Sequence, residues 1–199
     1  MKVETSPVTR GVVFEPEIKR VSPAVEDEFG FAETRLVAFK DLFARKLHAA
    51  PDRQHPRDLF DVKLLYENEG ITDDLFRAFL VYVASSNRPP HELLNPNLSQ
   101  LANVFEAEFS GMTVNPVTID DLTQVRVRLV QDIQSRLIDN GAQFLRTLVD
   151  RTPNFEAIGL PSAAELPAVQ WKLRNILNLR ETNPEKLAAQ RAILESLFG

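Results

Sequence analysis

The hydrophobic period of this chain changes near Phe31, and that change limits the folds that the chain can adopt. Residues 1–31 carry short β-branched runs, which three prolines and Gly11 interrupt. Such runs are typical of short strands and turns. From residue 32 onward, apolar residues recur at spacings of three and four, the period of amphipathic helices. We therefore predict a mainly α chain of the α+β class, with a small N-terminal β piece (1–31) before a helical domain (32–199).

Caps and breakers divide the helical part into segments. The first helix is expected over 33–50, where an apolar stripe precedes Pro51, and the stripe consists of Leu36, Phe39, Phe43, Leu47 and Ala50. Further helices are expected over 56–70, from 73 to the prolines at 89–90, over 98–109, 119–139, about 144–149, 168–180 and 184–198. The expected N-caps are Thr72, Thr118 and Asn183. We expect a helix end at Asn140-Gly141, a loop over 152–167, and Trp171 in the core.

Composition and charge exclude several classes of protein. The chain has 23 Lys and Arg against 28 Asp and Glu, and this net charge of −5 argues against broad nucleic-acid binding. A local basic patch would still suit an RNA acceptor. The absence of cysteine excludes disulfides, thiolate zinc sites and cysteine nucleophiles. No apolar run reaches the length of a membrane span, and the N-terminus lacks a signal peptide's apolar core. We therefore expect a cytoplasmic protein without membrane association.

Lys46 is the first candidate for chemistry, because it lies one step off the apolar stripe of its helix. A lysine at the edge of a buried face commonly lays its stem along apolar surface and keeps its charge in water. The alternative is that its ammonium reaches into a cleft and binds phosphate as a point charge. Both interpretations remain open from the pattern alone.

Asp58 and Asp61 are three residues apart, so they share one face of the following helix. Arg57 lies four residues before Asp61, and the two could form a surface ion pair of little energetic weight. Asp61 is expected to face inward more than Asp58, because Leu65 follows it on the same side.

The connection between these two helices is too short for anything but a tight return, so they should pack side by side. Lys46, Arg53, Arg57, Asp58 and Asp61 are then expected on one face. Cations and acids that converge in this way suit a metal–nucleotide complex. The alternative is a set of first-turn acids and solvated surface charges.

With these residues, the chain resembles the AbiEii/AbiGii family of nucleotidyltransferase toxins. That family shows a helix with a lysine, an arginine-rich turn, and a helix start of the type R-D-hydrophobic-aromatic-D. The counterparts here are ARKLHA (44–49), Arg53 and RDLFD (57–61). The closing segment PAVQWKLRN (167–175) also resembles the family's helical C-terminal end. The likeness extends over almost the whole chain.

The resemblance implies a nucleotidyltransferase fold, here truncated and covered by a helical C-terminal layer. It implies a nucleoside triphosphate and Mg²⁺ as cofactors, RNA as a possible acceptor, and a cognate antitoxin encoded alongside. It further implies catalytic roles for Lys46, Asp58 and Asp61, and nucleotide or phosphate binding by Arg53 and Arg57.

The chain departs from the family at two motifs. It has no Gly-Ser dipeptide, which holds phosphate in the family, and no Asp-x-Asp pair, which holds the magnesium ions of nucleotidyl transfer. We therefore expect that the chain begins late in the catalytic domain, with residues 1–31 as a remnant of its sheet, and has little activity alone. A truncated gene, a late start codon or a separately encoded N-terminal half would each account for this. Glu4 is the candidate for a remaining metal-binding acid.

Three functional hypotheses remain at this stage. The first is a nucleotidyltransferase-type toxin of an abortive-infection system that needs its missing half. The second is a catalytically inactive remnant that acts as a protein-binding helical module, and the third is a helical adaptor with only chance similarity. An unpartnered strand edge near residues 2–14 is expected to pair with another chain and to give a homo-oligomer.

Overall fold

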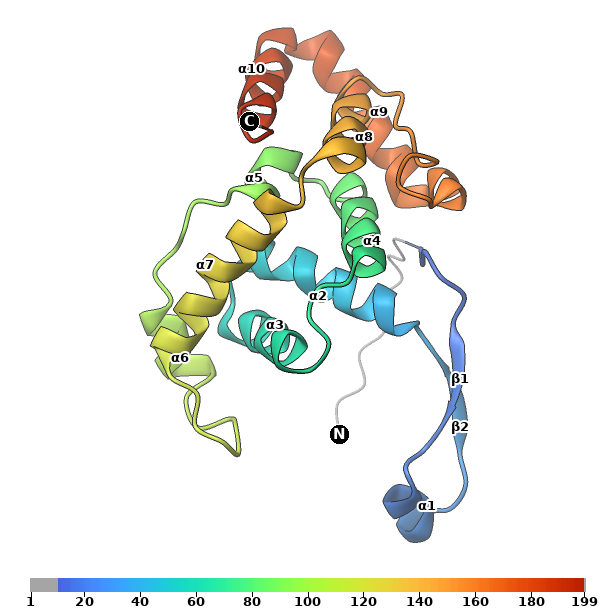
Figure 1. The fold of residues 1–199 in the computed structure, drawn as a ribbon, viewed down its shortest axis with the longest axis vertical. Coiled ribbons are helices and arrows are strands. Elements are labelled where there is room, and N and C mark those ends of the chain that lie inside the picture. Colours follow the sequence, from blue (N-terminus) through green and yellow to red (C-terminus); the bar gives the residue numbers. More distant parts are fainter. Residues whose placement is uncertain (1–10, 199) are drawn as a thin grey trace.

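The computed structural model of the chain describes residues 11–198 (Figure 1). The elements in order are β1 (Glu17–Arg20), α1 (Pro23–Phe29), β2 (Glu33–Leu36), α2 (Phe39–Arg53), α3 (Pro56–Asn68), α4 (Asp73–Ala84), α5 (Pro90–Leu94), α6 (Ala102–Glu108), α7 (Ile119–Ser135), α8 (Asp139–Val149), the 3-10 helix η1 (Pro161–Glu165), α9 (Pro167–Thr182) and α10 (Pro184–Glu195). The predicted fold class, mainly α with a small N-terminal β piece, is confirmed. No helix among the described residues is long and apolar enough to span a membrane.

β1, α1 and β2 form an arm that projects from the helical body (Figure 1). The two strands pair antiparallel, with Glu17 opposite Leu36 and Arg20 opposite Glu33. All eight strand residues are exposed, and α1 has no buried residue. The expected helix start at Glu33 is therefore wrong. Pairing with β1 satisfies the backbone of 33–36 there, and the apolar Leu36 belongs to this exposed hairpin rather than to a buried helical stripe.

Helix α4 lies at the centre of the helical body, and nine of its twelve residues are buried. A helix that is apolar on nearly every side must be covered on several faces. α2, α5, α8 and α9 all pack against it, while α3 packs on α2 and α7 on α3 (Figure 1). The expected N-caps are confirmed: Thr72, Thr118 and Asn183 each accept a hydrogen bond from the first turn of α4, α7 and α10.

Asp41 ties three parts of the chain together at the start of α2. Its fully buried carboxylate accepts hydrogen bonds from the backbone N–H groups of Val13 and Phe14, at 2.9 Å each, and from the Tyr82 hydroxyl at 2.5 Å. Arg45 completes the cluster, because it donates to the Tyr82 hydroxyl and to the Gly11 carbonyl. Burial, together with the bond to Asp41, raises the pKa of Tyr82 above its usual range. Segment 11–14 is thereby fixed to α2 and α4.

The sequence predicted that this helix would end before Pro51, but α2 continues to Arg53. Proline lacks a backbone N–H, yet Pro51 lies in the last turn and is buried, so only one helical hydrogen bond is lost there. The end comes at Gln54, which adopts a left-handed conformation (φ 50°) and donates its N–H to the Ala50 carbonyl. Of the predicted apolar stripe, Leu47 and Ala50 are buried, whereas Phe39 is exposed.

The later helix boundaries also differ in places. α7 ends at Ser135 and α8 begins at Asp139, so Asn140-Gly141 lies inside α8 and not at a helix end. The short α5 was not predicted, and α6 begins only at Ala102. The expected loop 152–167 contains η1. Trp171 is 49% exposed, because the buried line of α9 passes through Val169, Lys172 and Ile176 instead.

The strand edge expected near residues 2–14 lies, for residues 2–10, outside the described part of the chain. Residues 11–14 are not in a strand, so the expectation is wrong there. These residues instead run beside α2, where Asp41 and Arg45 hold them.

We predict that Asp41 contributes more to stability than its single charge suggests. Asp41→Ala leaves three buried or half-buried donors without an acceptor and should lower the free energy of unfolding by about 3 kcal/mol, and Tyr82→Phe by about 1 kcal/mol. Urea unfolding measures both. Asp27→Ala in the exposed helix α1 is the matched control and should change stability by less than about 0.5 kcal/mol. Equal effects of the two aspartate variants would refute the prediction.

Candidate functional site

The tight return between α2 and α3 brings the predicted site residues together. His55 caps α3 through its ring Nδ1, which accepts a hydrogen bond from the Arg57 N–H at 3.1 Å. Pro56 follows at the first helical position, where its missing N–H costs nothing. Since Gln54 turns the chain back through its left-handed conformation, α3 packs along α2, as expected.

Lys46 of α2 contacts Asp61 of α3. Its ammonium lies 2.6 Å from a carboxylate oxygen of Asp61, and the two side chains are 37% and 31% exposed. Lys46 and Asp61 therefore lie on the same side of the helix pair, which is required if the candidate residues share one face. The alternative, a surface ion pair between Arg57 and Asp61, does not occur: Asp61 accepts from Lys46, and Arg57 donates to the Glu108 carbonyl.

Arg53 and Asp58 form the second contact between the two helices. The guanidinium lies 2.6 Å from a carboxylate oxygen, and the Asp58 side chain is only 6% exposed. The expectation that Asp61 would face inward more than Asp58 is therefore wrong. The buried line of α3 passes through Asp58, Val62 and Leu65, so Asp61 lies on its flank.

Arg57 does not join these two pairs. Its guanidinium donates to the backbone carbonyl of Glu108 at 3.1 Å, close to where the His55 ring meets the Glu108 carboxylate. The structure thus brings Lys46, Arg53, Asp58 and Asp61 together and directs Arg57 toward α6.

A hollow of about 460 Å³ on α2 adds residues that the sequence analysis did not single out. Arg45, Asp52 and the predicted Lys46 and Arg53 line it. The spacing of seven between Lys46 and Arg53, two helical turns, is the sequence signal that could have indicated this common face. Arg88, in the loop before α5, pairs with Asp52 of this lining.

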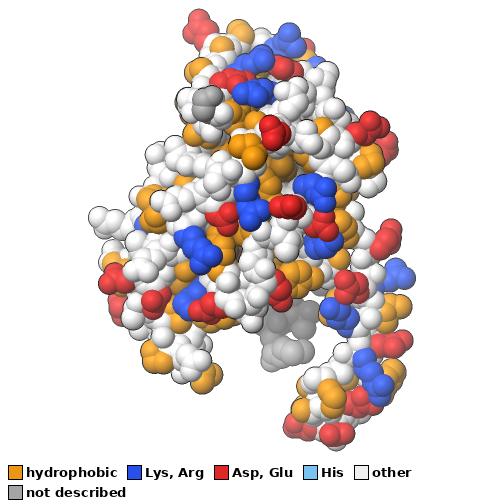
Figure 2. All heavy atoms as spheres, viewed as in Figure 1, with side chains coloured by type: hydrophobic (Ala, Val, Ile, Leu, Met, Phe, Trp, Pro, Cys, Tyr) orange, Lys and Arg blue, Asp and Glu red, His pale blue; other side chains and the backbone are white. Residues whose placement is uncertain are grey.

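The charges around this region are mixed rather than uniformly basic. Figure 2 shows Lys and Arg side chains interspersed with Asp and Glu on the visible face. Lys46, Arg53, Asp58 and Asp61 form what we call the α2–α3 cluster. Each of its cations has an acidic partner, so a phosphate bound here would have to compete with a carboxylate. The arrangement suits a site in which a bound phosphate replaces the carboxylate of Asp58 or Asp61 as the partner of the cation.

The residues present do not fit a Mg²⁺ site. Between residues 11 and 198, no group of three His, Asp or Glu side chains is placed to hold a metal ion. The carboxylates of the candidate site are those of Asp52, Asp58 and Asp61, and each is engaged by a cation. Glu4, the other candidate for a metal ligand, lies outside the described residues. No step of the chemistry is therefore assigned to a metal held by these side chains.

Comparison with known proteins gives one match. A family model described as "Nucleotidyl transferase AbiEii toxin, Type IV TA system" matches residues 1–175. No curated protein and no solved structure shows a significant match. The matched region includes both ion pairs of the α2–α3 cluster and ends within α9, so α10 lies beyond it.

We predict that the two ion pairs differ in strength. In double-mutant cycles with Met and Asn replacements, Arg53–Asp58 should show a coupling of about 1–2 kcal/mol, because Asp58 is nearly buried. Lys46–Asp61, which is more exposed, should show about 0.5 kcal/mol. Urea unfolding of the single and double variants gives both values. A larger coupling for Lys46–Asp61 would contradict the assignment of Asp58 to the buried face.

Proposed function

Because the chain belongs to the AbiEii nucleotidyl transferase toxin family of type IV toxin–antitoxin systems, we propose that its α2–α3 face binds the phosphates of a nucleoside triphosphate. Family membership also implies an antitoxin as partner. We place the action of the toxin in the cytoplasm, with RNA as the acceptor of the transferred nucleotide. The Lys46–Asp61 contact carries the proposal, since it holds the partly exposed side chain of Lys46, which lines the α2 hollow.

Lys46 is proposed to bind phosphate directly. The Lys46 side chain is 37% exposed and that of Asp61 31%, so the ammonium can leave Asp61 without losing a buried partner, and a phosphate group offers more negative charge than one carboxylate. Asp61 then holds the lysine only in the free chain and competes with the incoming phosphate for the ammonium. This role explains why the two residues are placed together from different helices, since helix formation alone does not require the pair.

Arg53 and Asp58 are proposed to act in the same way on a second phosphate. Arg53 is 62% exposed, and its planar guanidinium can hold two oxygens of one phosphate at once. The nearly buried carboxylate of Asp58 accepts a hydrogen bond from one terminal nitrogen of this guanidinium. Arg57, tied to the Glu108 carbonyl, is proposed to contact the nucleotide only at the margin of the site.

Nucleotidyl transfer itself is proposed to need groups that these helices do not supply. Both carboxylates of the cluster are paired with cations, and the sequence holds neither a Gly-Ser dipeptide nor an Asp-x-Asp pair. The proposal is therefore that this chain binds nucleotide but transfers little of it unaided. The group-transfer machinery of the family would come from a second segment or chain.

A second candidate function is a protein-binding helical module, and the projecting arm favours it. Ile18, Phe29 and Phe31 are 66%, 75% and 61% exposed on this arm. Large apolar side chains gathered on an exposed element are typical of protein contacts. In this alternative, the α2–α3 ion pairs only stabilise the helix pair.

The first test is nucleotide binding. Each of the four nucleoside triphosphates is titrated with Mg²⁺ into the full chain by calorimetry. Lys46→Met should weaken binding of the preferred nucleotide about ten-fold, whereas Asp61→Asn should tighten it, because the ammonium is freed. Lys40→Met is the matched control: it removes the same charge from the first turn of α2, where Lys40 pairs with Asp74. Unchanged affinity in Lys46→Met would overturn the proposal.

The second test is transfer. Radiolabelled nucleoside triphosphates are incubated with bulk RNA and the chain, and the label in RNA is counted. We expect weak labelling by the chain alone and strong labelling when a family segment with Gly-Ser and Asp-x-Asp motifs is added. Strong labelling without that segment would refute the expectation of little activity. No labelling in either case, with the arm capturing the antitoxin, would favour the binding module.

A further inference from the structure

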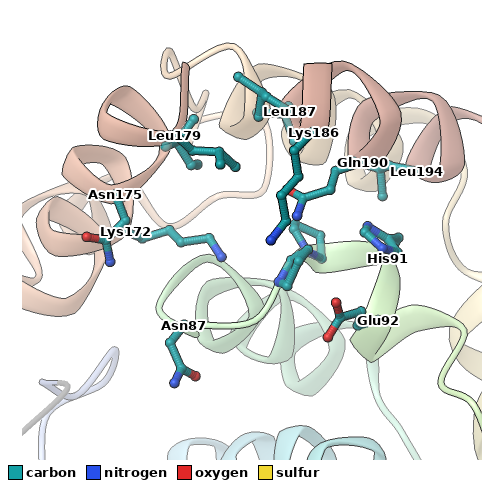
Figure 3. Close-up of a pocket in the computed structure, with 14 residues that line it drawn as sticks. Asn87, His91, Glu92, Lys172, Asn175, Leu179, Lys186, Leu187, Gln190 and Leu194 are labelled. Atoms are coloured by element: carbon teal, nitrogen blue, oxygen red, sulfur yellow. The ribbon is translucent and has the colours of Figure 1, made fainter. Parts of the chain in front are cut away.

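A second cavity, of about 270 Å³, lies where α5, α9 and α10 meet (Figure 3). It shares no lining residue with the hollow on α2. Its wall on the α10 side falls outside residues 1–175, the region of the family match. The volume is close to the lower limit for small-molecule sites, which is about 300 Å³.

Two lysines converge on this cavity from different helices. Lys172 of α9 and Lys186 of α10 both extend their ammonium groups into it (Figure 3). Lys172 is only 5% exposed, and its one hydrogen bond is to the Arg88 carbonyl. Two of its three N–H donors therefore have no acceptor among the described residues. Lys186 has no ion-pair partner in the described chain.

Neutral donors and apolar side chains complete the lining. Asn175 and Gln190 lie beside the lysines, and the ring Nδ1 of His91 is buried without a hydrogen-bond partner in the described chain. Glu92 is the one acid of the lining, and Arg88 pairs with it at 3.4 Å. The apolar side chains of the lining are those of Val149, Ile176, Leu179, Leu187 and Leu194, together with Pro89 and Pro90. The cavity thus combines a cationic end with an apolar wall.

A buried lysine without a carboxylate partner is costly, since its charge must be taken out of water. Here burial lowers the pKa of Lys172 to about 8, and Glu92 only partly opposes this effect. The pKa of His91 is also lowered by burial, so the ring is neutral at pH 7 and can donate from Nδ1. An anion between the two lysines would accept hydrogen bonds from the N–H groups that lack a partner. It would thereby compensate the cost of burying the Lys172 charge.

We propose that the cavity between α5, α9 and α10 binds a small organic anion, with its phosphate or carboxylate group between Lys172 and Lys186 and its apolar part against α9 and α10. The proposal does not depend on the α2–α3 site. It accounts for two cations placed together without an ion-pair partner among the described residues. Phosphate and carboxylate ligands share this chemistry, and the experiment separates them.

Phenyl phosphate and benzoate serve as the probes, and benzyl alcohol as the uncharged ligand of similar shape. Each is titrated into the full chain at pH 7 and followed by ¹H–¹⁵N NMR. We expect saturable shifts of the Asn175 and Gln190 side-chain amides with one or both anions and none with benzyl alcohol. Larger affinity for phenyl phosphate or for benzoate identifies the phosphate or the carboxylate class. No saturable shift with either anion up to about 10 mM would overturn the proposal.

Two variants test the placement of the anion. Lys186→Met, at an exposed position, should keep the fold and weaken binding about five-fold or more. Lys63→Met in α3 removes the same charge outside the cavity and should leave binding unchanged. Equal binding by Lys186→Met and the unaltered chain would contradict the proposal. Lys172→Met removes the donor of the Arg88 carbonyl and can therefore destabilise the fold. Its binding is compared only if its thermal unfolding midpoint equals that of the unaltered chain.

The pH dependence gives a measurement without any variant. The titratable groups that face Lys172 are Glu92 and the neutral His91 from α5 and Lys186 from α10. Since the pKa of Lys172 is about 8, its charge is present at pH 7 and is lost as the pH rises. Affinity for phenyl phosphate, a dianion throughout this range, should fall about five-fold or more between pH 7 and pH 9.5. Constant affinity would exclude Lys172 from the site.

Discussion

The buried carboxylate of Asp41 is the interaction on which the rest of the described structure depends. A charge that is fully removed from water is tolerated only when its oxygens are satisfied, and here two backbone N–H groups and the Tyr82 hydroxyl satisfy them. These three donors come from segment 11–14 and from α4, whereas Asp41 itself begins α2. The orientation of α2 on the central helix follows from this geometry, and with it the position of every side chain that α2 carries.

The two candidate ligand sites are linked through Arg88, in the loop between α4 and α5. Its guanidinium pairs with Asp52 at the hollow on α2, while its carbonyl accepts the hydrogen bond of Lys172 from the second cavity. Asp52 also holds the guanidinium in its charged form and raises the pKa of Arg88. One residue of a short loop therefore contacts a lining residue of each site. One of these residues, Asp52, precedes the loop in the sequence, and the other, Lys172, follows it.

Opposite charges are used differently in the two sites. On α2 and α3 the cations Lys46 and Arg53 each have a carboxylate partner, so these pairs stabilise the helix packing in the free chain, and a bound anion would have to replace a carboxylate. Between α9 and α10 the lysines have no such partner within residues 11–198, and the cost of burial appears as the lowered pKa of Lys172. The first arrangement gives a stable surface, whereas the second leaves donors available to an incoming group.

The sequence alone determined the elements whose signals are local. The caps at Thr72, Thr118 and Asn183 and the return from α2 to α3 follow from residue types within one turn. The convergence of Lys46 with Asp61 was also predictable, because a short return leaves two helices little choice but to pack side by side.

Tertiary structure decided the pairings. Asp61 pairs with Lys46 and not with Arg57, since an exposed pair within one helix is worth only a few tenths of a kcal/mol and a neighbouring helix easily replaces it. The burial of Asp58 and of Lys172 depends on which helices cover α3 and α9. Each lies on a line of buried residues by spacing, yet its charge conceals this until the covering helices are in place.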